Sequence, residues 1–172
     1  MPDAEMLMLV DPDWKPSADQ PNPPREAVSG AWTVSPQGVR GRFEPNPVYR
    51  PLRPETPLDP LDAVLRGLSR TDPVSELLAP ALRDALLAIA VDEQDVALVR
   101  RAPDGTPVVM VVSAYGHREQ LDVPAWRDVT VEELAEALPA KGIDVLVNPA
   151  STASIRIPAT VVFELAGRAE GR

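Results

Sequence analysis

The chain has 172 residues, 44% of them hydrophobic, and it contains no cysteine. This length suits one domain of about 100 to 150 residues with an added segment, and the lack of cysteine excludes disulfides and thiolate metal sites. A net charge of −9 and a pI near 4.6 argue against a nucleic-acid partner, because phosphate backbones are bound by clustered lysine and arginine.

The first residues do not have the pattern of a targeting signal. The apolar stretch from Met6 to Val10 is short and follows the acidic residues Asp3 and Glu5, whereas a signal peptide needs positive charge and a longer apolar run. No run in the chain reaches the roughly 18 to 20 apolar residues that cross a membrane. We therefore expect a cytoplasmic protein that does not insert into membranes.

Residues 1–57 are expected to form a proline-rich N-terminal segment. The first 60 residues hold 13 of the 21 prolines of the chain. The stretch from Met6 to Val10 predicts a short strand, and the polar, proline-rich residues 15–26 predict an extended linker without periodic structure.

A β-hairpin is predicted over residues 30–43. Trp32 and Val34 alternate on one side of a strand, and the turn that follows contains Gly38, which supplies the backbone freedom that a tight turn requires. Because an isolated hairpin is marginally stable in water, it must lie against the strand 6–10 or against the later domain.

The second segment, residues 58–172, is predicted to begin with two helices. Apolar residues at helical spacing follow Pro60, which a first helical turn tolerates, and they predict a helix over residues 60–68. A second apolar stripe from Val74 to Ile89 predicts another helix, kinked or split at Pro80.

Two strands are predicted next, over residues 96–100 and 107–113, joined by a turn at residues 103–105. Their continuous β-branched character is typical of strands that are covered on both faces. The polar residues 115–124 are expected to form a loop.

The C-terminal part is predicted to alternate helix and strand. Thr130 begins a helix with a capping box, and Trp126 is expected to pack its ring on the apolar face of that helix. Strands are expected over residues 143–147 and 154–157, and residues 158–167 fit either a helix or a strand. Together these elements predict an α/β fold, with α+β as an alternative, in which helices flank a small mixed sheet.

Few residues of the chain suggest catalysis or metal binding. His117 is the one histidine and is expected on the surface, because no nucleophile stands at a suitable spacing. The acidic groups Glu132 with Glu133, and residues 92–95, are expected to be solvated. No glycine pattern of a nucleotide site is present. We therefore expect no enzymatic activity, no cofactor and no metal.

Aromatic residues gather in and after the hairpin, in a chain that has only 4% of them. Tyrosine, tryptophan and arginine are the residues that most often anchor protein interfaces. One interpretation is that these side chains fasten the N-terminal segment to the domain, and the other is that they bind a partner. The partner-binding candidates here are Trp32, Phe43, Asn46, Tyr49 and Arg50.

Three further candidates follow the strand 143–147. Asn148 is expected to form a turn in which its side-chain amide satisfies nearby backbone groups, with ligand binding as the alternative. Ser151 and Arg156, with Ser154 between them, have the hydroxyl and guanidinium groups that bind an anion. If Asn148, Ser151 and Arg156 converged in a deep pocket, an enzymatic site at this turn would be favoured.

Three motifs in order along the chain carry a resemblance to a known family. They are Gly30-Ala-Trp-Thr-Val34, Gly41-Arg-Phe-Glu-Pro-Asn-Pro-Val-Tyr-Arg-Pro51 and Val145-Leu-Val-Asn-Pro-Ala-Ser-Thr-Ala-Ser-Ile-Arg-Ile-Pro158. With them the chain resembles the type VII secretion system-associated proteins of actinobacteria. Residues 72–165 further resemble the SseB N-terminal domain, although Ala150 stands where a glycine is common.

The resemblance implies an association with type VII secretion and no catalytic residues. The expected function is that of a non-enzymatic accessory or adaptor protein, whose protein partner is a secretion component or a secreted substrate. The alternatives are an immunity protein that neutralises a secreted toxin through its acidic surface, and an enzyme with a site at the Asn148 turn. The oligomeric state is left open.

Overall fold

The computed structural model describes residues 5–139 and 142–169, which form two sheets and five α-helices. The strands are β1 (Glu5–Val10), β2 (Val28–Val34), β3 (Arg40–Pro45), β4 (Leu87–Val91), β5 (Val99–Arg101), β6 (Pro107–Val112), β7 (Ala125–Val129), β8 (Asp144–Val147) and β9 (Ile155–Ile157). The helices are α1 (Pro60–Ser69), α2 (Leu78–Asp84), α3 (Tyr115–Arg118), α4 (Val131–Ala137) and α5 (Ala159–Ala169), with short 3-10 turns at Arg25–Ala27 and Ser75–Leu77.

The N-terminal sheet consists of β1, β2 and β3, all antiparallel. The predicted hairpin is therefore confirmed. It contacts both the strand at residues 6–10 and the later domain, which were the two alternatives. β1 pairs with β2, while β3 meets the second segment just after α2 through a bridge between Phe43 and Ala85. Gly30 is required here because the ring of Phe43 and the Glu44 carbonyl occupy the place of a side chain on it.

The six-stranded sheet has the order β7-β4-β6-β8-β9, with β5 paired to one end of β6. All its pairings are antiparallel except β6 with β8. This mixed sheet, flanked by helices, confirms the predicted α/β class.

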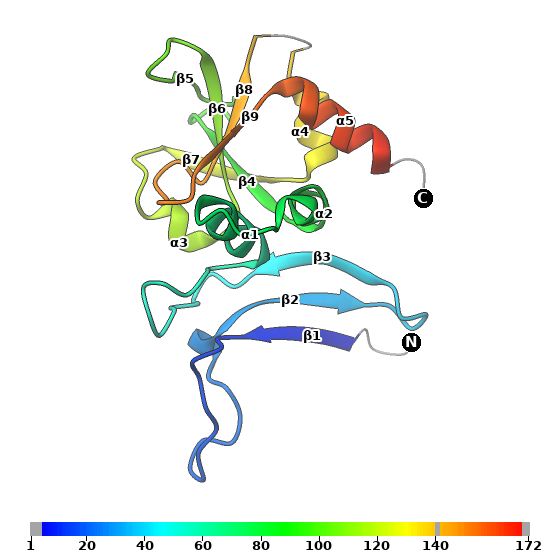
Figure 1. Ribbon diagram of the computed structural model, residues 1–172, viewed down its shortest axis with the longest axis vertical. Helices are drawn as coiled ribbons and strands as arrows, with labels where there is room; N and C mark the ends of the chain where they lie inside the picture. Colours follow the sequence, from blue (N-terminus) through cyan, green and yellow to red (C-terminus); the bar gives the residue numbers. More distant parts are fainter. Residues whose placement is uncertain (1–4, 140–141, 170–172) are drawn as a thin grey trace.

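Helices α1, α2, α4 and α5 cover one face of the six-stranded sheet. A single apolar core joins Leu61 of α1, Leu82 of α2, Leu134 of α4 and Val162 of α5 to the strand residues on that face, such as Ile89. Figure 1 shows α1 and α2 between the two sheets, with β3 nearest these helices and β1 farthest from them. Within the described residues, no helix is long and apolar enough to cross a membrane.

The predicted helix from Val74 to Ile89 is wrong in its second half. The 3-10 turn and α2 end at Asp84, and residues 87–91 form β4, the strand that pairs with both β6 and β7. All five residues of β4 are buried. The error arises because a run of leucine, alanine and isoleucine fits a buried strand as well as a helix.

Two further predictions about this region are wrong. The residues around β5 lie at the surface, where Val96 is 59% and Val99 is 49% exposed, so they are not covered on both faces. β6, in contrast, is buried as predicted from Val108 onward. The expected loop 115–124 begins with the short helix α3.

Trp126 does not pack on α4 as predicted. It lies in β7 and pairs directly with Ala90, so the two side chains share one face of the sheet. The neighbouring residue Ile89 faces the opposite side, where it joins the core with Leu134 of α4. The ring of Trp126 instead lies 5.9 Å from the Arg118 guanidinium.

The other C-terminal elements agree with the sequence analysis. Thr130 and Glu133 form the predicted capping box at the start of α4. Residues 144–147 and 155–157 are the expected strands. The segment 158–167, which fitted either a helix or a strand, lies in helix α5 from Ala159 onward.

Candidate functional site

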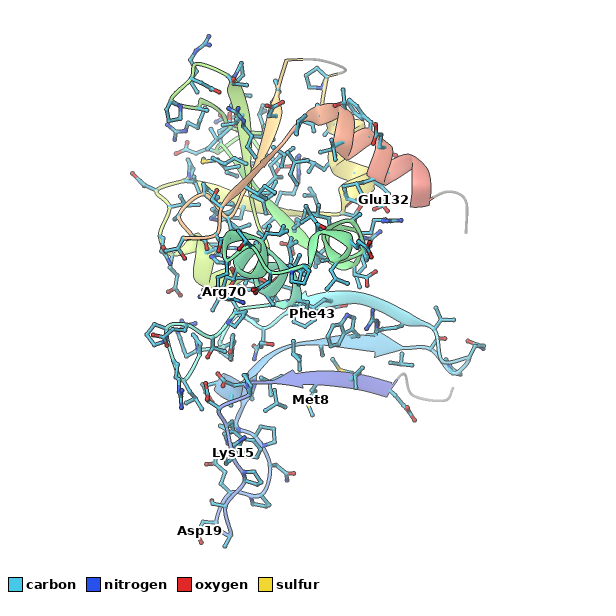
Figure 2. The ribbon with its side chains drawn as sticks, in the orientation of Figure 1. Met8, Lys15, Asp19, Phe43, Arg70 and Glu132 are labelled. Carbon is cyan, nitrogen blue, oxygen red and sulfur yellow. The ribbon has the colours of Figure 1, made fainter. Side chains whose placement is uncertain are left out.

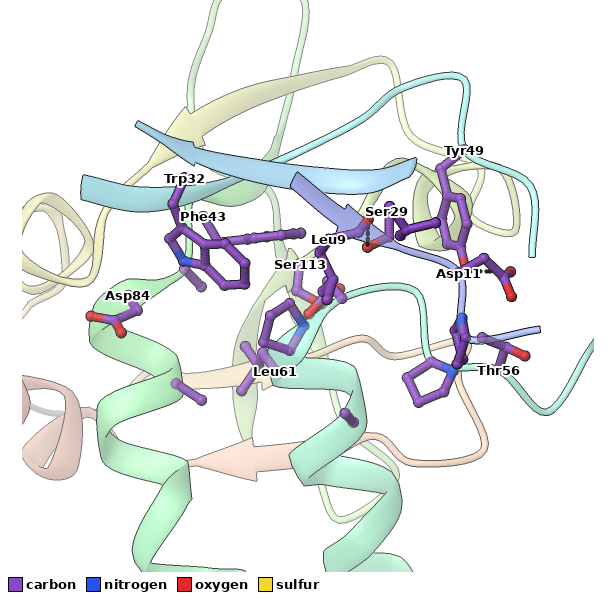
Figure 3. Close-up of a pocket in the computed structure, with 18 of the residues that line it drawn as sticks. Leu9, Asp11, Ser29, Trp32, Phe43, Tyr49, Thr56, Leu61, Asp84 and Ser113 are labelled. Atoms are coloured by element: carbon purple, nitrogen blue, oxygen red, sulfur yellow. Dashed lines mark hydrogen bonds between the residues drawn. The ribbon is translucent and has the colours of Figure 1, made fainter. Parts of the chain in front are cut away.

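One face of the N-terminal sheet forms a cavity with α1 and α2. Leu9, Trp32 and Phe43 project from the sheet toward Leu61, as Figure 3 shows. The rings of Trp32 and Phe43 contact each other edge to face, with centroids 4.8 Å apart. The cavity has a volume of about 500 Å³, and most of its wall is apolar. We call it the inner cavity.

Polar contacts also hold the N-terminal sheet to the helices. Arg40 pairs with Asp84 at 3.0 Å and also lies over the ring of Trp32. Arg42 pairs with Glu132 of α4 at 2.7 Å and donates to the Arg83 carbonyl. These contacts dock the N-terminal sheet on the helices, as the fastening interpretation of its aromatic residues requires.

Tyr49 anchors the segment between β3 and α1, residues 46–57, which we call the strap. Its hydroxyl donates to the buried Asp11 carboxylate at 2.9 Å, and Leu52 N donates to the same oxygen at 3.0 Å. Burial alone raises the pKa of Asp11, but these bonds and one from Asp13 N outweigh it and leave this pKa below its ordinary value. Asp11 is therefore ionised and ties the strap to the end of β1.

A chain of buried hydrogen bonds connects α1 to the six-stranded sheet. Asp59 caps α1 by accepting from Asp62 N at 2.9 Å, and the Ser113 hydroxyl donates to its other oxygen at 2.7 Å. Ser113 N in turn donates to Asn148 Oδ1 at 2.9 Å. Burial raises the pKa of Asp59 to about 6, although its hydrogen bonds oppose this shift.

Asn148 has the structural role that the sequence analysis favoured. Its backbone is in the left-handed region, with φ of 50°, which asparagine tolerates better than most residues. Its side chain satisfies the backbone N–H of Ser113 and also donates to the Ser113 hydroxyl at 2.9 Å. The residue is fully buried.

The opposite face of the N-terminal sheet is open to solvent. Met6 and Met8 pair with Thr33 and Ala31, so they point away from the face that carries Trp32. Met6 is 61% and Met8 is 56% exposed, and Figure 2 shows Met8 on the strand farthest from the helices. A groove of about 450 Å³ runs over this surface, and we call it the methionine groove. Its lining includes Met6, Met8, Val28, Ala31, Pro45, Arg25, Glu44 and Asn46.

The predicted partner-binding residues of the N-terminal segment lie in different places. Phe43 and Tyr49 are buried, and Trp32 is half-buried beside the inner cavity, as the fastening interpretation requires. Asn46 borders the methionine groove, where its amide donates to the carbonyls of Arg25 and Val28 at 2.8 Å. Arg50 is exposed and pairs with Glu119 at 3.0 Å.

Asn148, Ser151 and Arg156 do not converge in one pocket. Arg156 pairs with Asp104 at 2.6 Å on an exposed surface, whereas Asn148 is buried. Ser154 donates to the Val147 carbonyl at 3.1 Å. The combined anion site of Ser151, Ser154 and Arg156 is therefore not formed. Ser151 instead lines a cavity that it shares with Tyr49 and Arg50.

The prediction for His117 is wrong, because its side chain is buried. It lies in α3 with 3% of its side chain exposed, and its Nε2 is 3.7 Å from Oδ1 of the fully buried Asp62. The polar sequence around His117 suggested a loop. That pattern holds no signal that a helical turn and α1 would enclose the imidazole.

Met6 and Met8 were not among the predicted binding residues, because their stretch of sequence predicted only a strand. The available signal was their alternation with Leu7 and Leu9, because a strand that is apolar on both faces needs a cover on both.

In the described part of the chain, no three histidine or acidic side chains lie together as a metal ion requires. Comparisons with protein-family models, curated proteins and solved structures find no match.

Proposed function

We propose that this protein is a non-enzymatic adaptor or accessory protein of type VII secretion that acts by binding another protein. The link to secretion rests on the resemblance of the three sequence motifs. The binding role rests on one observation, the exposed apolar surface of the N-terminal sheet around Met6 and Met8.

This surface has the properties of a binding site for a polypeptide. Methionine is flexible and polarisable, so it adapts to partner side chains of varied shape. β1 pairs with β2 and, within residues 5–139 and 142–169, with no other strand. An exposed apolar edge strand of this kind is a template for pairing with another chain. The partner therefore contacts both the groove and the edge.

A second candidate function is that of an immunity protein. The observation that favours it is the net charge of −9, which steers a basic partner such as a nuclease or another toxin with a cationic active site. The two functions differ in the partner, and both use protein binding.

Affinity purification of the tagged full-length protein from its native host, followed by mass spectrometry, tests the proposal. An adaptor retrieves components or substrates of the secretion system, whereas an immunity protein retrieves one toxin that dissociates slowly. Tagged Met6→Ser/Met8→Ser protein provides the control, because both substitutions lie on the surface. Retrieval of neither kind of partner, or equal retrieval by the variant, contradicts the proposal.

A further inference from the structure

A second cavity, of about 390 Å³, lies where the strap, α1, α3 and the turn after β8 meet. Its lining includes the polar residues Arg50, Arg66, His117, Glu119, Gln120, Ser151 and Thr152. These residues are far apart in the sequence, and the fold brings them to one place. We call it the His117 cavity.

His117 is the group in this cavity that lacks a partner. Neither ring nitrogen has a hydrogen-bond partner among the described residues, and the same holds for Asp62 Oδ1. The 3.7 Å between His117 Nε2 and Asp62 Oδ1 is too long for a hydrogen bond. Buried polar atoms are nearly always bonded in folded proteins. A buried imidazole without partners at the wall of a cavity therefore points to a ligand.

The charges around the cavity indicate what kind of ligand it takes. Although the whole chain carries −9, the lining contains two arginines and one carboxylate. Arg66 is held by Asp62 at 3.0 Å. Arg50 is 57% exposed; its Nη1 donates to the Tyr49 carbonyl at 2.8 Å, and its Nη2 pairs with the exposed Glu119 at 3.0 Å. Arg50 is thus available to a competing anion.

The remaining donors support the same assignment. Ser151 Oγ accepts from Ala153 N at 3.1 Å, which leaves its hydroxyl hydrogen to be donated. An arginine, an imidazole and a hydroxyl are the groups with which proteins bind carboxylates and phosphates.

We propose that the His117 cavity binds an anionic group, a carboxylate or a phosphate, through Arg50, His117 and Ser151. The inference is independent of the type VII secretion role. The bound anion lies against the imidazole, and Asp62 lies on its Nε2 side. With an anion and Asp62 both near the ring, the protonated form of His117 gains two acceptors.

Protonation of His117 couples to this binding. Burial lowers the pKa of the free imidazole, Asp62 raises it, and Arg66 lowers it again. The other charged groups that face the cavity are Arg50 and Glu119. A bound anion adds an attractive charge and so raises the pKa of His117, because an opposite charge within a few ångströms stabilises the charged form. Binding is therefore accompanied by proton uptake.

The chain has one histidine, so its imidazole signals in an NMR spectrum are unambiguous. Inorganic phosphate and acetate are titrated into the full-length protein, and the pKa of His117 is measured with and without each anion. We expect a saturable shift of the His117 signals and a pKa raised by about one unit or more. A response to phosphate alone identifies a phosphate site, and a stronger response to acetate identifies a carboxylate site.

Two variants change the affinity in opposite directions. Arg50→Gln should weaken binding about tenfold, because it removes a charge-assisted hydrogen bond. Glu119→Gln should strengthen binding about two- to fivefold, because it frees Arg50 from a surface ion pair that competes with the ligand. Arg53→Gln is the matched control, since Arg53 lies on the strap, is 69% exposed and is outside the cavity lining. Circular dichroism confirms that the variants fold.

The proposal is overturned if neither anion shifts the His117 signals at millimolar concentration. It is also overturned if Arg50→Gln and Arg53→Gln bind equally well, or if Glu119→Gln weakens binding.

Discussion

The two sheets of this protein use apolar residues in opposite ways. In the six-stranded sheet, β4 and most of β6 are buried on both faces, so their apolar side chains are explained by the core. In the N-terminal sheet, one face packs on α1 and α2, but Met6 and Met8 on the other face remain exposed. The comparison shows where the chain has apolar surface that its own fold does not use.

The two sheets also differ in how they are held. The six-stranded sheet is joined to its helices by a continuous apolar core. The N-terminal sheet adds polar anchors to its apolar contacts, such as Tyr49 with Asp11 and Arg42 with Glu132. Since polar anchors need specific partners at specific distances, this attachment fixes the orientation of the sheet and of its exposed face.

The difference between the two sheets should be largest in a matched pair of leucine substitutions. Leu87 in β4 is 1% exposed and Leu7 in β1 is 51% exposed. Leu87→Ala should lower the free energy of unfolding by about 2 to 5 kcal/mol through loss of burial and a residual cavity. Leu7→Ala should change it by less than about 0.5 kcal/mol. Urea denaturation measures both, and similar values for the two variants would show that the two leucines contribute equally to the fold.

Substitution of Asp59 should stabilise the protein at neutral pH. Burial raises the pKa of Asp59 from 3.8 to about 6, so the folded state favours the protonated form. Because the pKa of the Asp59 carboxyl group is raised in the fold, its contribution to stability is fully present below about pH 4 and is lost as the pH rises through about 6. At about 1.4 kcal/mol for each pH unit between the two values, ionisation costs the folded state up to about 3 kcal/mol.

Asp59→Asn keeps the helix cap, because asparagine also accepts from Asp62 N. The Ser113 hydroxyl loses Oδ2 of Asp59 as its acceptor, but it lies 3.3 Å from Asn148 Oδ1 and can donate there instead. We therefore expect the substitution to increase the free energy of unfolding by about 1 to 3 kcal/mol at pH 7.5 and to leave it unchanged at pH 4. Thermal denaturation at the two pH values measures it. If stability rises equally at both pH values, or falls at pH 7.5, then ionisation of the buried Asp59 does not destabilise the folded state.

Tyr49→Phe tests the polar anchor of the strap. It removes the hydroxyl that donates to buried Asp11, and a hydrogen bond to a charged group contributes about 1.5 to 3 kcal/mol. Because the pKa of Asp11 is depressed in the fold, this stability is present above the unfolded value and is lost as the pH falls through the folded value. The cost of the substitution should therefore shrink in acid. A cost that does not depend on pH indicates lost packing instead.

The N-terminal sheet was predictable from sequence because its signals are local. The turn at residues 35–38 and the alternation of Trp32 with Val34 define the hairpin without reference to the rest of the chain. The capping box at Thr130 is equally local. β4 was not predictable in this way, because residues 85–91 contain no turn residue that separates the strand from α2.

The candidate sites depended on contacts that no local pattern records. His117 is enclosed by α1 and the strap, which lie about 50 or more residues earlier in the chain. Tyr49 was correctly singled out, but only the fold pairs it with Asp11. Met6 and Met8 became candidates once the fold left their face uncovered.

In the proposed function, the exposed face of the N-terminal sheet binds a protein partner. The most direct test compares the wild type with Met6→Ser/Met8→Ser in binding to the partner retrieved from the native host. We expect the affinity to fall by about tenfold or more, because apolar side chains at the centre of an interface dominate binding energy. The free energy of unfolding should change by less than about 0.5 kcal/mol, since both side chains are exposed. Unchanged affinity in the correctly folded variant contradicts the claim.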